Sequence, residues 1–210
     1  MPLIDGRGIL CYNILSGVTS MKRKTTKDIL AESFLELAET KRIDKIRISD
    51  ITDNCGMSAP TFYNHFKDKY DLIVWIHTHR VKAIMSKIDK DGYRWKDTLL
   101  DGARYYYENR SYIINALKHT SGQDSFVGYV TRNNIKVLAN EVRRKLMTEY
   151  IPPEIYGLIK MYIYGTVHFM LDWLIDETEL TPEQVAQMWE KALPQPLKQY
   201  LCNDQDFIIS

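Results

Sequence analysis

The chain is short of cysteine and of long apolar runs, and each shortage excludes a class of protein. Its 210 residues include three cysteines, Cys11, Cys55 and Cys202, too few and too scattered for a disulfide framework. The longest strongly apolar stretch, Met161 to Leu171, has eleven residues. A membrane-spanning helix needs about 20 apolar residues. We therefore expect a cytoplasmic protein in which residues 161–171 belong to a buried helix.

The sequence also lacks the motifs that carry enzyme chemistry. It contains no Gly-rich phosphate loop, no Gly-x-Ser-x-Gly and no His-Glu-x-x-His, and its five histidines do not have a metal-binding spacing. We therefore expect no catalytic residues, no metal site and no cofactor. Residues 1–20 show no convincing secretory signal, and we interpret them as an upstream extension that precedes the folded part.

The net charge is small, but its distribution along the chain is uneven. A total of +1 by itself argues against a protein that neutralises phosphates. Residues 21–90, however, hold 14 Lys and Arg against 10 Asp and Glu, whereas residues 91–210 hold 13 against 16. A basic segment joined to an acidic one indicates that the first segment meets a polyanion.

Nearly every segment after residue 25 has the spacing of apolar residues that is typical of helices. Residues 26–41, for example, place Leu30, Phe34, Leu37 and Ala38 on one face. We expect an all-α protein of about nine helices. Its first three helices would form a small unit at residues 21–67, and the remaining helices would form a larger unit at residues 68–210.

Residues 49–66 have the layout of a helix-turn-helix motif. Ser49 can cap a short helix, Gly56 permits a sharp turn, and Ser58 can cap a second helix that runs to about His65. The exposed positions of the second helix carry short or hydrogen-bonding side chains, which can contact base edges and phosphates. The alternative is an ordinary pair of helices within a core.

The stretch at residues 48–72 resembles the DNA-binding signature of the tetracycline-repressor (TetR) family of bacterial transcription regulators. The positions that match are Gly56, Ser58, Thr61, Tyr63, Phe66, Lys69 and Leu72. Residues 63–76 and 162–173 are similar to a Firmicutes-type subgroup that includes activators of dihydroxyacetone-kinase operons. The resemblance is specific for residues 21–72, and beyond them it rests on length and helix pattern alone.

The resemblance implies a set of DNA contacts. Tyr63 and Lys69 would bind phosphates, Thr61 and Asn64 would read bases, and His65 would do either. A basic arm ahead of the first helix would reach a groove or the backbone, unless it is only a solvated chain end. The full expected set is Lys22, Lys24, Ser49, Ser58, Ala59, Pro60, Thr61, Tyr63, Asn64, His65 and Lys69.

The second half of the chain offers a dimer interface. Small helix-turn-helix domains usually read DNA as dimers, and the helix at residues 154–175 is apolar almost all round. The resemblance implies a four-helix bundle made by the last two long helices of each copy. The alternative is the central helix of a monomer core. The residues expected at the interface are Ile159, Tyr162, Ile163, Val167, Met170 and Trp189.

An effector pocket is also implied by the resemblance, although a subgroup with a protein co-regulator would need none. Consecutive helical residues point about 100° apart, so Tyr105, Tyr106 and Tyr107 cannot all face one core. The residues expected to line a pocket are Tyr105, Tyr106, Tyr112, His119, His168 and Trp173. Ordinary packing of these aromatic groups is the competing interpretation.

The sequence therefore predicts a homodimeric regulator that binds double-stranded operator DNA and responds to a small molecule or a partner protein. A helical adaptor that binds another protein through residues 154–175 and no longer recognises DNA remains the alternative.

Overall fold

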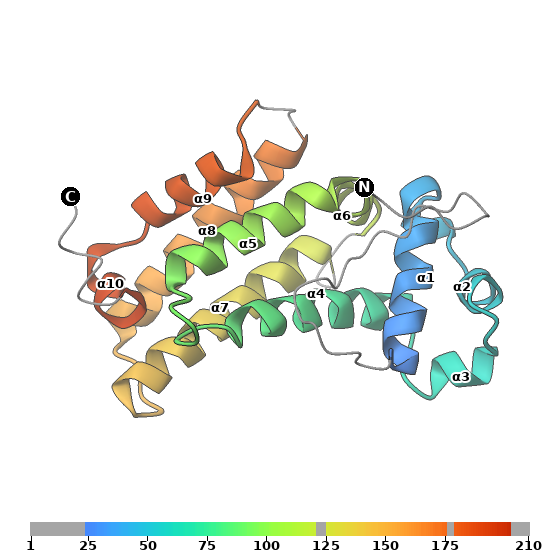
Figure 1. The fold of residues 1–210 in the computed structure, drawn as a ribbon, viewed down its shortest axis with the longest axis horizontal. Coiled ribbons are helices and arrows are strands. Elements are labelled where there is room, and N and C mark those ends of the chain that lie inside the picture. The colour runs from blue at the N-terminus through green and yellow to red at the C-terminus, as the bar shows by residue number, and fades with distance from the viewer. Residues whose placement is uncertain (1–23, 121–124, 176–178, 203–210) are drawn as a thin grey trace.

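The computed structural model describes residues 24–120, 125–175 and 179–202. These ranges are helical and contain no strand (Figure 1). The helices are α1 (Thr26–Thr40), η1 (Ile43–Lys45, one 3₁₀ turn), α2 (Ile48–Asn54), α3 (Ala59–Tyr63), α4 (Lys69–Met85), α5 (Trp95–Glu108), α6 (Arg110–His119), α7 (Phe126–Leu146), α8 (Pro153–Ile175), α9 (Pro182–Lys191) and α10 (Gln195–Leu201). The expected all-α fold is confirmed.

The small N-terminal group of helices, α1 to α3, lies at one end of the molecule (Figure 1). Thr25 caps α1, and the buried face of α1 includes Leu30 and Phe34, as the helical spacing predicts. Asp68 caps α4 by accepting hydrogen bonds from the backbone N–H groups of Tyr70 and Asp71. Helix α4 then extends from this group into the larger body, so it belongs to both parts of the fold.

The larger body consists of α5 to α10 together with the second half of α4. Helix α5 packs along α9, and α7 packs along α8. The apolar helix α8 buries Ile159, Val167 and Leu174 in this core. Among the described residues, no helix is both long enough and apolar enough to cross a membrane.

The chain forms one more helix at its end than the sequence indicates. Helix α10 begins at Gln195, directly after Pro194, with Pro196 in its first turn. A proline is tolerated there because the first backbone N–H groups of a helix have no partner within the helix. The two prolines therefore separate α9 from α10 without ending the helical fold.

Candidate functional site

The two short helices of the motif are held at a fixed crossing by apolar contacts and a turn. Ile51 of α2 and Phe62 of α3 are fully buried. Gly56 has a φ of +66°, in the left-handed region that glycine adopts without strain. The Ser58 hydroxyl accepts a hydrogen bond from the N–H of Thr61 and caps α3. These features confirm the expected turn and N-cap.

Helix α1 fixes α2 through a chain of hydrogen bonds. The Ser33 hydroxyl donates to the carbonyl oxygen of Ile51 at 2.7 Å, and the Asn54 side chain donates to Ser33 and Glu36. Cys55, at the end of α2, is half-buried with its Sγ atom 3.2 Å from the same Ile51 carbonyl oxygen. This packing is that of a small apolar residue.

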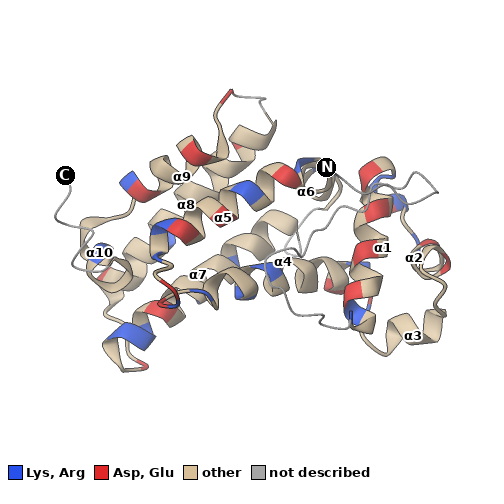
Figure 2. Ribbon diagram, in the orientation of Figure 1, with Lys and Arg blue, Asp and Glu red and all other residues tan. Residues whose placement is uncertain are grey.

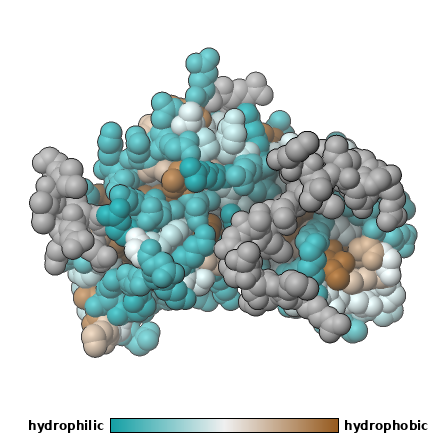
Figure 3. Space-filling view, in the orientation of Figure 1, coloured by the Kyte–Doolittle hydropathy of each residue, from teal (hydrophilic) through white to brown (hydrophobic). Residues whose placement is uncertain are grey.

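Helix α3 presents a surface without charge. It contains no Lys, Arg, Asp or Glu and is drawn entirely in tan in Figure 2. Pale and brown residues gather beside α1 and α3 in Figure 3, whereas the face over α5 and α9 is mostly teal. The expected contact residues that are exposed here are Ser58, Ala59, Pro60, Tyr63 and Asn64. Such a surface can approach the base edges of a groove without a charge to desolvate.

The base-reading residues predicted for α3 differ in what they present. Asn64 is exposed just after the helix, and its backbone N–H still bonds to the carbonyl oxygen of Pro60 at 3.0 Å. The hydroxyls of Thr61 and Ser58 lie 2.8 Å apart and bond to each other. Thr61 and His65 are both only half-buried. The hydroxyl of Thr61 is therefore held within the first turn of α3 by Ser58.

Two exposed cations that the sequence reasoning missed flank the motif. Arg47 precedes α2, and Lys67 follows α3. Ser49 is exposed in the first turn of α2, but the N-cap of this helix is Arg47, so the cap expected at Ser49 is wrong. The positive charge of Arg47 and Lys67 and their position beside the motif could have identified them from the sequence as candidate DNA contacts. Lys22 lies outside the described residues, and the Lys24 ammonium pairs with Glu32 at 2.8 Å.

Lys69 does not have the free ammonium group that a phosphate contact requires, so that expectation is corrected. Its Nζ atom donates to the carbonyl oxygens of Ile43, Asp44 and Ile46 at 2.7, 3.0 and 2.9 Å. A lysine ammonium has three donors, and all three are used. Burial lowers the pKa of Lys69, in agreement with this enclosed position. Lys69 thus fixes η1 to the start of α4.

Asn115 of α6 holds the same turn from the larger body. Its Oδ1 atom accepts from the N–H of Ile43 at 3.0 Å, and its Nδ2 atom donates to the carbonyl oxygens of Ala38 and Lys41, each at 2.8 Å. The ring of Tyr112, also on α6, packs edge-on against Phe34 of α1. Hydrogen bonds from α4 therefore hold η1, and hydrogen bonds from α6 hold both η1 and the end of α1.

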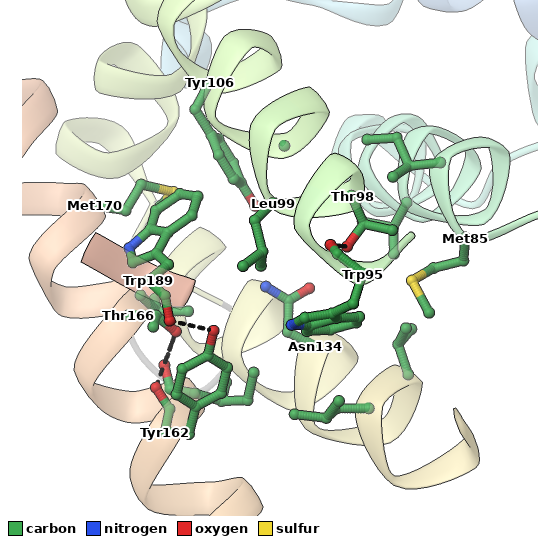
Figure 4. Close-up of a pocket in the computed structure, with 17 residues that line it drawn as sticks. Met85, Trp95, Thr98, Leu99, Tyr106, Asn134, Tyr162, Thr166, Met170 and Trp189 are labelled. Carbon is green, nitrogen blue, oxygen red and sulfur yellow. Dashed lines mark hydrogen bonds between the residues drawn. The ribbon is translucent and has the colours of Figure 1, made fainter. Parts of the chain in front are cut away.

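The larger body contains a cavity of about 130 Å³ between α4, α5, α7, α8 and α9 (Figure 4). Four aromatic residues, Trp95, Tyr106, Tyr162 and Trp189, contribute to its wall. The remaining lining residues are Val81, Ile84, Met85, Thr98, Leu99, Gly102, Asn134, Val137, Leu138, Ile163, Thr166, Val167 and Met170. The wall is thus largely apolar, with a few polar groups.

Of the six residues expected to line an effector pocket, Tyr106 is the one that lines this cavity. Tyr105 and Tyr112 are buried elsewhere in the core, and Tyr107 is half exposed. The ring of His119 lies 3.9 Å from Asp44. His168 is exposed on α8, and Trp173 donates to the carbonyl oxygen of Leu180. The spacing of aromatic residues along the sequence did not show which faces of the helices would meet around the cavity.

The residues expected at a dimer interface lie inside the protomer. All six are buried, and Tyr162, Ile163, Val167, Met170 and Trp189 line the cavity, so a second copy cannot reach them. The outward faces of α8 and α9 carry other apolar residues instead: Met161, Tyr164 and Met188 are 71%, 48% and 43% exposed. Because α8 is apolar almost all round, its sequence does not show which narrow face remains exposed to solvent.

An all-helical chain with a helix-turn-helix at one end of a larger helical body is a DNA-binding regulator in architecture. Residues 35–74 match the model described as bacterial regulatory proteins of the tetR family, and residues 93–195 match that of a transcriptional regulator C-terminal region. The chain belongs to the TetR family of bacterial transcriptional regulators. This is a family of regulators and not of enzymes.

Relatives agree with this assignment. The chain is 31% identical over 85 residues to the HTH-type dhaKLM operon transcriptional activator DhaS of Lactococcus lactis, a match that covers 40% of this chain and 45% of that protein. The solved structure of a dihydroxyacetone kinase operon activator DhaS has a TM-score of 0.62 at 17% identity, covering 83% of this chain and 97% of its own.

A TetR transcriptional regulator from Rhodococcus sp. RHA1 has a similar fold. Its TM-score is 0.59 at 14% identity, and the match covers 83% of this chain and 97% of that one. Each likeness covers more than four-fifths of this chain, so the fold over most of its length is that of the family.

Proposed function

We propose that two copies of the chain bind one palindromic operator in the cytoplasm, each reading a half-site with α3. The observation that carries this proposal is the surface of α3 and the turn after it. Tyr63 is 59% exposed and Asn64 is exposed beside it. An asparagine amide can pair with two atoms of adenine, and a tyrosine hydroxyl can bind a phosphate.

The basic residues that support DNA binding in this proposal are Arg47 and Lys67, with Lys24 at the start of α1. Lys24 would exchange its surface ion pair with Glu32 for a phosphate, at little cost because exposed ion pairs contribute little. The short side chains of Ala59 and Pro60 then allow the backbone of α3 to approach the groove closely.

The dimer contact in this proposal falls on the outward face of α8, with α9 beside it. Gly157, Met161, Tyr164 and His168 follow one another at spacings of three or four residues and share one side of the helix. Met188 adds an exposed apolar side chain on α9. A two-fold pairing of α8 and α9 would bury these side chains and place two copies of α3 for the two half-sites.

Light scattering after size-exclusion chromatography tests the dimer. We expect a dimer for the wild type and a monomer for Met161→Glu, because the new charge would have no partner in an apolar contact. Met147→Glu is the matched control, since Met147 is 89% exposed and lies outside α8 and α9. A wild-type monomer at micromolar concentration, or a dimer that survives Met161→Glu unchanged, would contradict this interface.

Selection from a pool of random duplexes at low salt tests the function itself. We expect a palindrome to be enriched, with half-sites spaced by about one helical turn. Asn64→Ala should then relax the preference at the base that Asn64 reads. If no palindrome is enriched, the adaptor interpretation is favoured, in which the exposed α8 face binds another protein.

Regulation is the remaining part of the proposal, and it is placed on the larger body. Either a small molecule in the cavity or a protein bound at the surface would change how strongly the dimer holds DNA. The name of the Lactococcus lactis relative suggests where to search for the operator, namely upstream of dihydroxyacetone kinase genes. A reporter placed behind the selected palindrome would show whether binding activates or represses.

A further inference from the structure

The cavity between α4 and α9 has the size of a small ring compound. Its volume is about 130 Å³. Apolar protein cavities of about 150 Å³ stay dry and bind benzene. The space is therefore close to that of one aromatic ring, and because the cavity is not fully enclosed, a short substituent can extend from its open side.

The chemistry of the wall excludes a charged occupant. None of the residues that line the cavity is Asp, Glu, Lys, Arg or His. A carboxylate or an ammonium group would lose its hydration without finding a counter-charge. Four aromatic side chains and the thioethers of Met85 and Met170 surround the space, and both kinds of group pack favourably against an aromatic ring.

Most of the hydroxyls in the wall are already bonded within the protein. The hydroxyl of Thr98 donates to the carbonyl oxygen of Trp95 at 2.6 Å, and that of Thr166 donates to the carbonyl oxygen of Tyr162 at 2.9 Å. The Tyr162 hydroxyl donates to the carbonyl oxygen of Trp189 at 2.9 Å. These groups have no need of a ligand.

The indole N–H groups of Trp95 and Trp189 are different. Both side chains are more than nine-tenths buried, and neither Nε1 atom has an acceptor among the described residues. An indole nitrogen can only donate, so its need can be met only by an acceptor atom. In Figure 4 the nitrogen end of the Trp95 ring lies beside Asn134, in the middle of the lining residues.

We propose that this cavity binds a small uncharged aromatic molecule that carries a hydrogen-bond acceptor, such as an aryl ketone, with its oxygen on Trp95 Nε1. The inference rests on the proposed function in that it names the ligand class of the regulatory body. Asn134 also lines the cavity, and its amide offers a second polar contact there.

Three probes of nearly the same shape test the ligand class by isothermal titration calorimetry on the full chain. Acetophenone carries a neutral carbonyl, α-methylstyrene replaces its oxygen by a methylene, and benzoate replaces its methyl by a charged oxygen. We expect acetophenone to bind, α-methylstyrene to bind at least fivefold more weakly, and benzoate not to bind. Equal or tighter binding of benzoate, or binding of none of the three at millimolar concentration, would overturn the proposal.

Two variants assign the binding to the cavity. Trp95→Phe keeps a ring but removes the donor, so acetophenone should weaken to the level of α-methylstyrene while α-methylstyrene is unchanged. Gly102→Leu should abolish binding of both, because a Cβ atom at Gly102 meets open space and a longer side chain can fill it. Gly102→Ala, which adds a single methyl, serves if the larger change prevents folding, and it should weaken both probes.

Unchanged binding in Trp95→Phe and in the Gly102 variant that folds would overturn the assignment. The selection from random duplexes separates this proposal from the proposed function. A protein that enriches a palindrome but binds no neutral aromatic compound contradicts the ligand class alone. A protein that binds acetophenone in the cavity but enriches no palindrome contradicts the DNA-binding function and leaves the ligand class intact.

Discussion

The ammonium nitrogen of Lys69 lies 2.7 Å from the carbonyl oxygen of Ile43, and it also bonds the carbonyl oxygens of Asp44 and Ile46. From the other side, Asn115 accepts a hydrogen bond from the N–H of Ile43. The single 3₁₀ turn between α1 and α2 is therefore bonded to both α4 and α6. This turn fixes the helix-turn-helix to the larger body, and its bonds predict effects that differ from those of DNA contacts.

Lys69→Met should destabilise the fold without removing a phosphate contact. The change leaves three carbonyl oxygens without their charged donor, and we expect the free energy of unfolding to fall by about 2 kcal/mol. Urea denaturation measures this change. The slope of the logarithm of DNA affinity against the logarithm of salt concentration should stay as in the wild type, when measured where the variant is folded.

Lys67→Gln is the matched change at the phosphate contact that we propose for Lys67. Lys67 is exposed and lies two residues before Lys69. Its loss should leave the stability unchanged, weaken the binding of all DNA sequences alike and reduce the salt slope by about 1. The opposite pattern, with the reduced slope in Lys69→Met and the reduced stability in Lys67→Gln, would restore Lys69 as the phosphate contact.

Asn115→Asp should destabilise the protein although it changes a single group. The aspartate would still accept from the N–H of Ile43, but its second oxygen would face the carbonyl oxygens of Ala38 and Lys41, to which Asn115 donates. We expect a loss of about 2 to 3 kcal/mol in urea denaturation near pH 7.

Asn140→Asp is the control for this change, because the exposed Asn140 accepts from Arg143 and an aspartate would do so at least as well. Equal stability of the Asn115→Asp variant and the wild type would mean that the hydrogen bonds of Asn115 do not hold the helix-turn-helix to the larger body.

His77 should make the fold sensitive to mild acid. Burial among the rings of Tyr106, Phe126 and Tyr129 lowers the pKa of His77 to about 4, from 6.5, with a small opposing effect of Asn134. Because the unfolded chain takes up the proton first, stability is complete above pH 6.5 and falls as the pH drops toward 4. The full loss is about 3 kcal/mol.

Thermal unfolding at a series of pH values between 4 and 7 measures this loss. His77→Phe should flatten the dependence over that range, whereas His79→Gln, at an exposed position on the same helix, should leave it in place. If both variants follow the wild-type curve, another group is responsible for the acid sensitivity.

Gly56→Ala should destabilise the turn between α2 and α3 by about 1 kcal/mol. A Cβ atom there meets nothing within 4 Å, so the cost comes from the φ of +66° alone. Gly157→Ala, within α8, should have the opposite sign, because alanine is the better helix former and its methyl also meets open space. Chemical denaturation of both variants compares the two, and equal signs would contradict the assigned backbone geometry.

Local rules predicted most of the elements and the turn of the motif. The cap at Ser58 and the left-handed Gly56 depend on neighbouring residues, so their sequence context is sufficient to place them, although the cap of α2 falls at Arg47 rather than at Ser49. The sequence also predicted that the three consecutive tyrosines cannot all face one core. Tyr105 and Tyr106 are buried, whereas Tyr107 is half exposed.

Contacts between distant segments were not predictable in the same way. Lys69 carries a charge that suits a phosphate, and no pattern in the sequence shows that three carbonyl groups lie within its reach. Tyr162 and Trp189 are apolar enough for a dimer contact or a cavity wall, and the packing of five helices decides between them. The site therefore required the tertiary arrangement, whereas the motif that carries it did not.

Sequence-specific DNA reading is tested most directly by the affinity of the wild-type protein for the selected palindrome and for a scrambled duplex of the same composition, measured by fluorescence anisotropy at one physiological salt concentration. Specific regulators bind their sites about a thousandfold or more tighter than other DNA. We expect a ratio of at least about a thousand for the wild type, and a markedly lower ratio for Asn64→Ala. Equal affinity for the two duplexes would contradict sequence-specific reading by this helix-turn-helix.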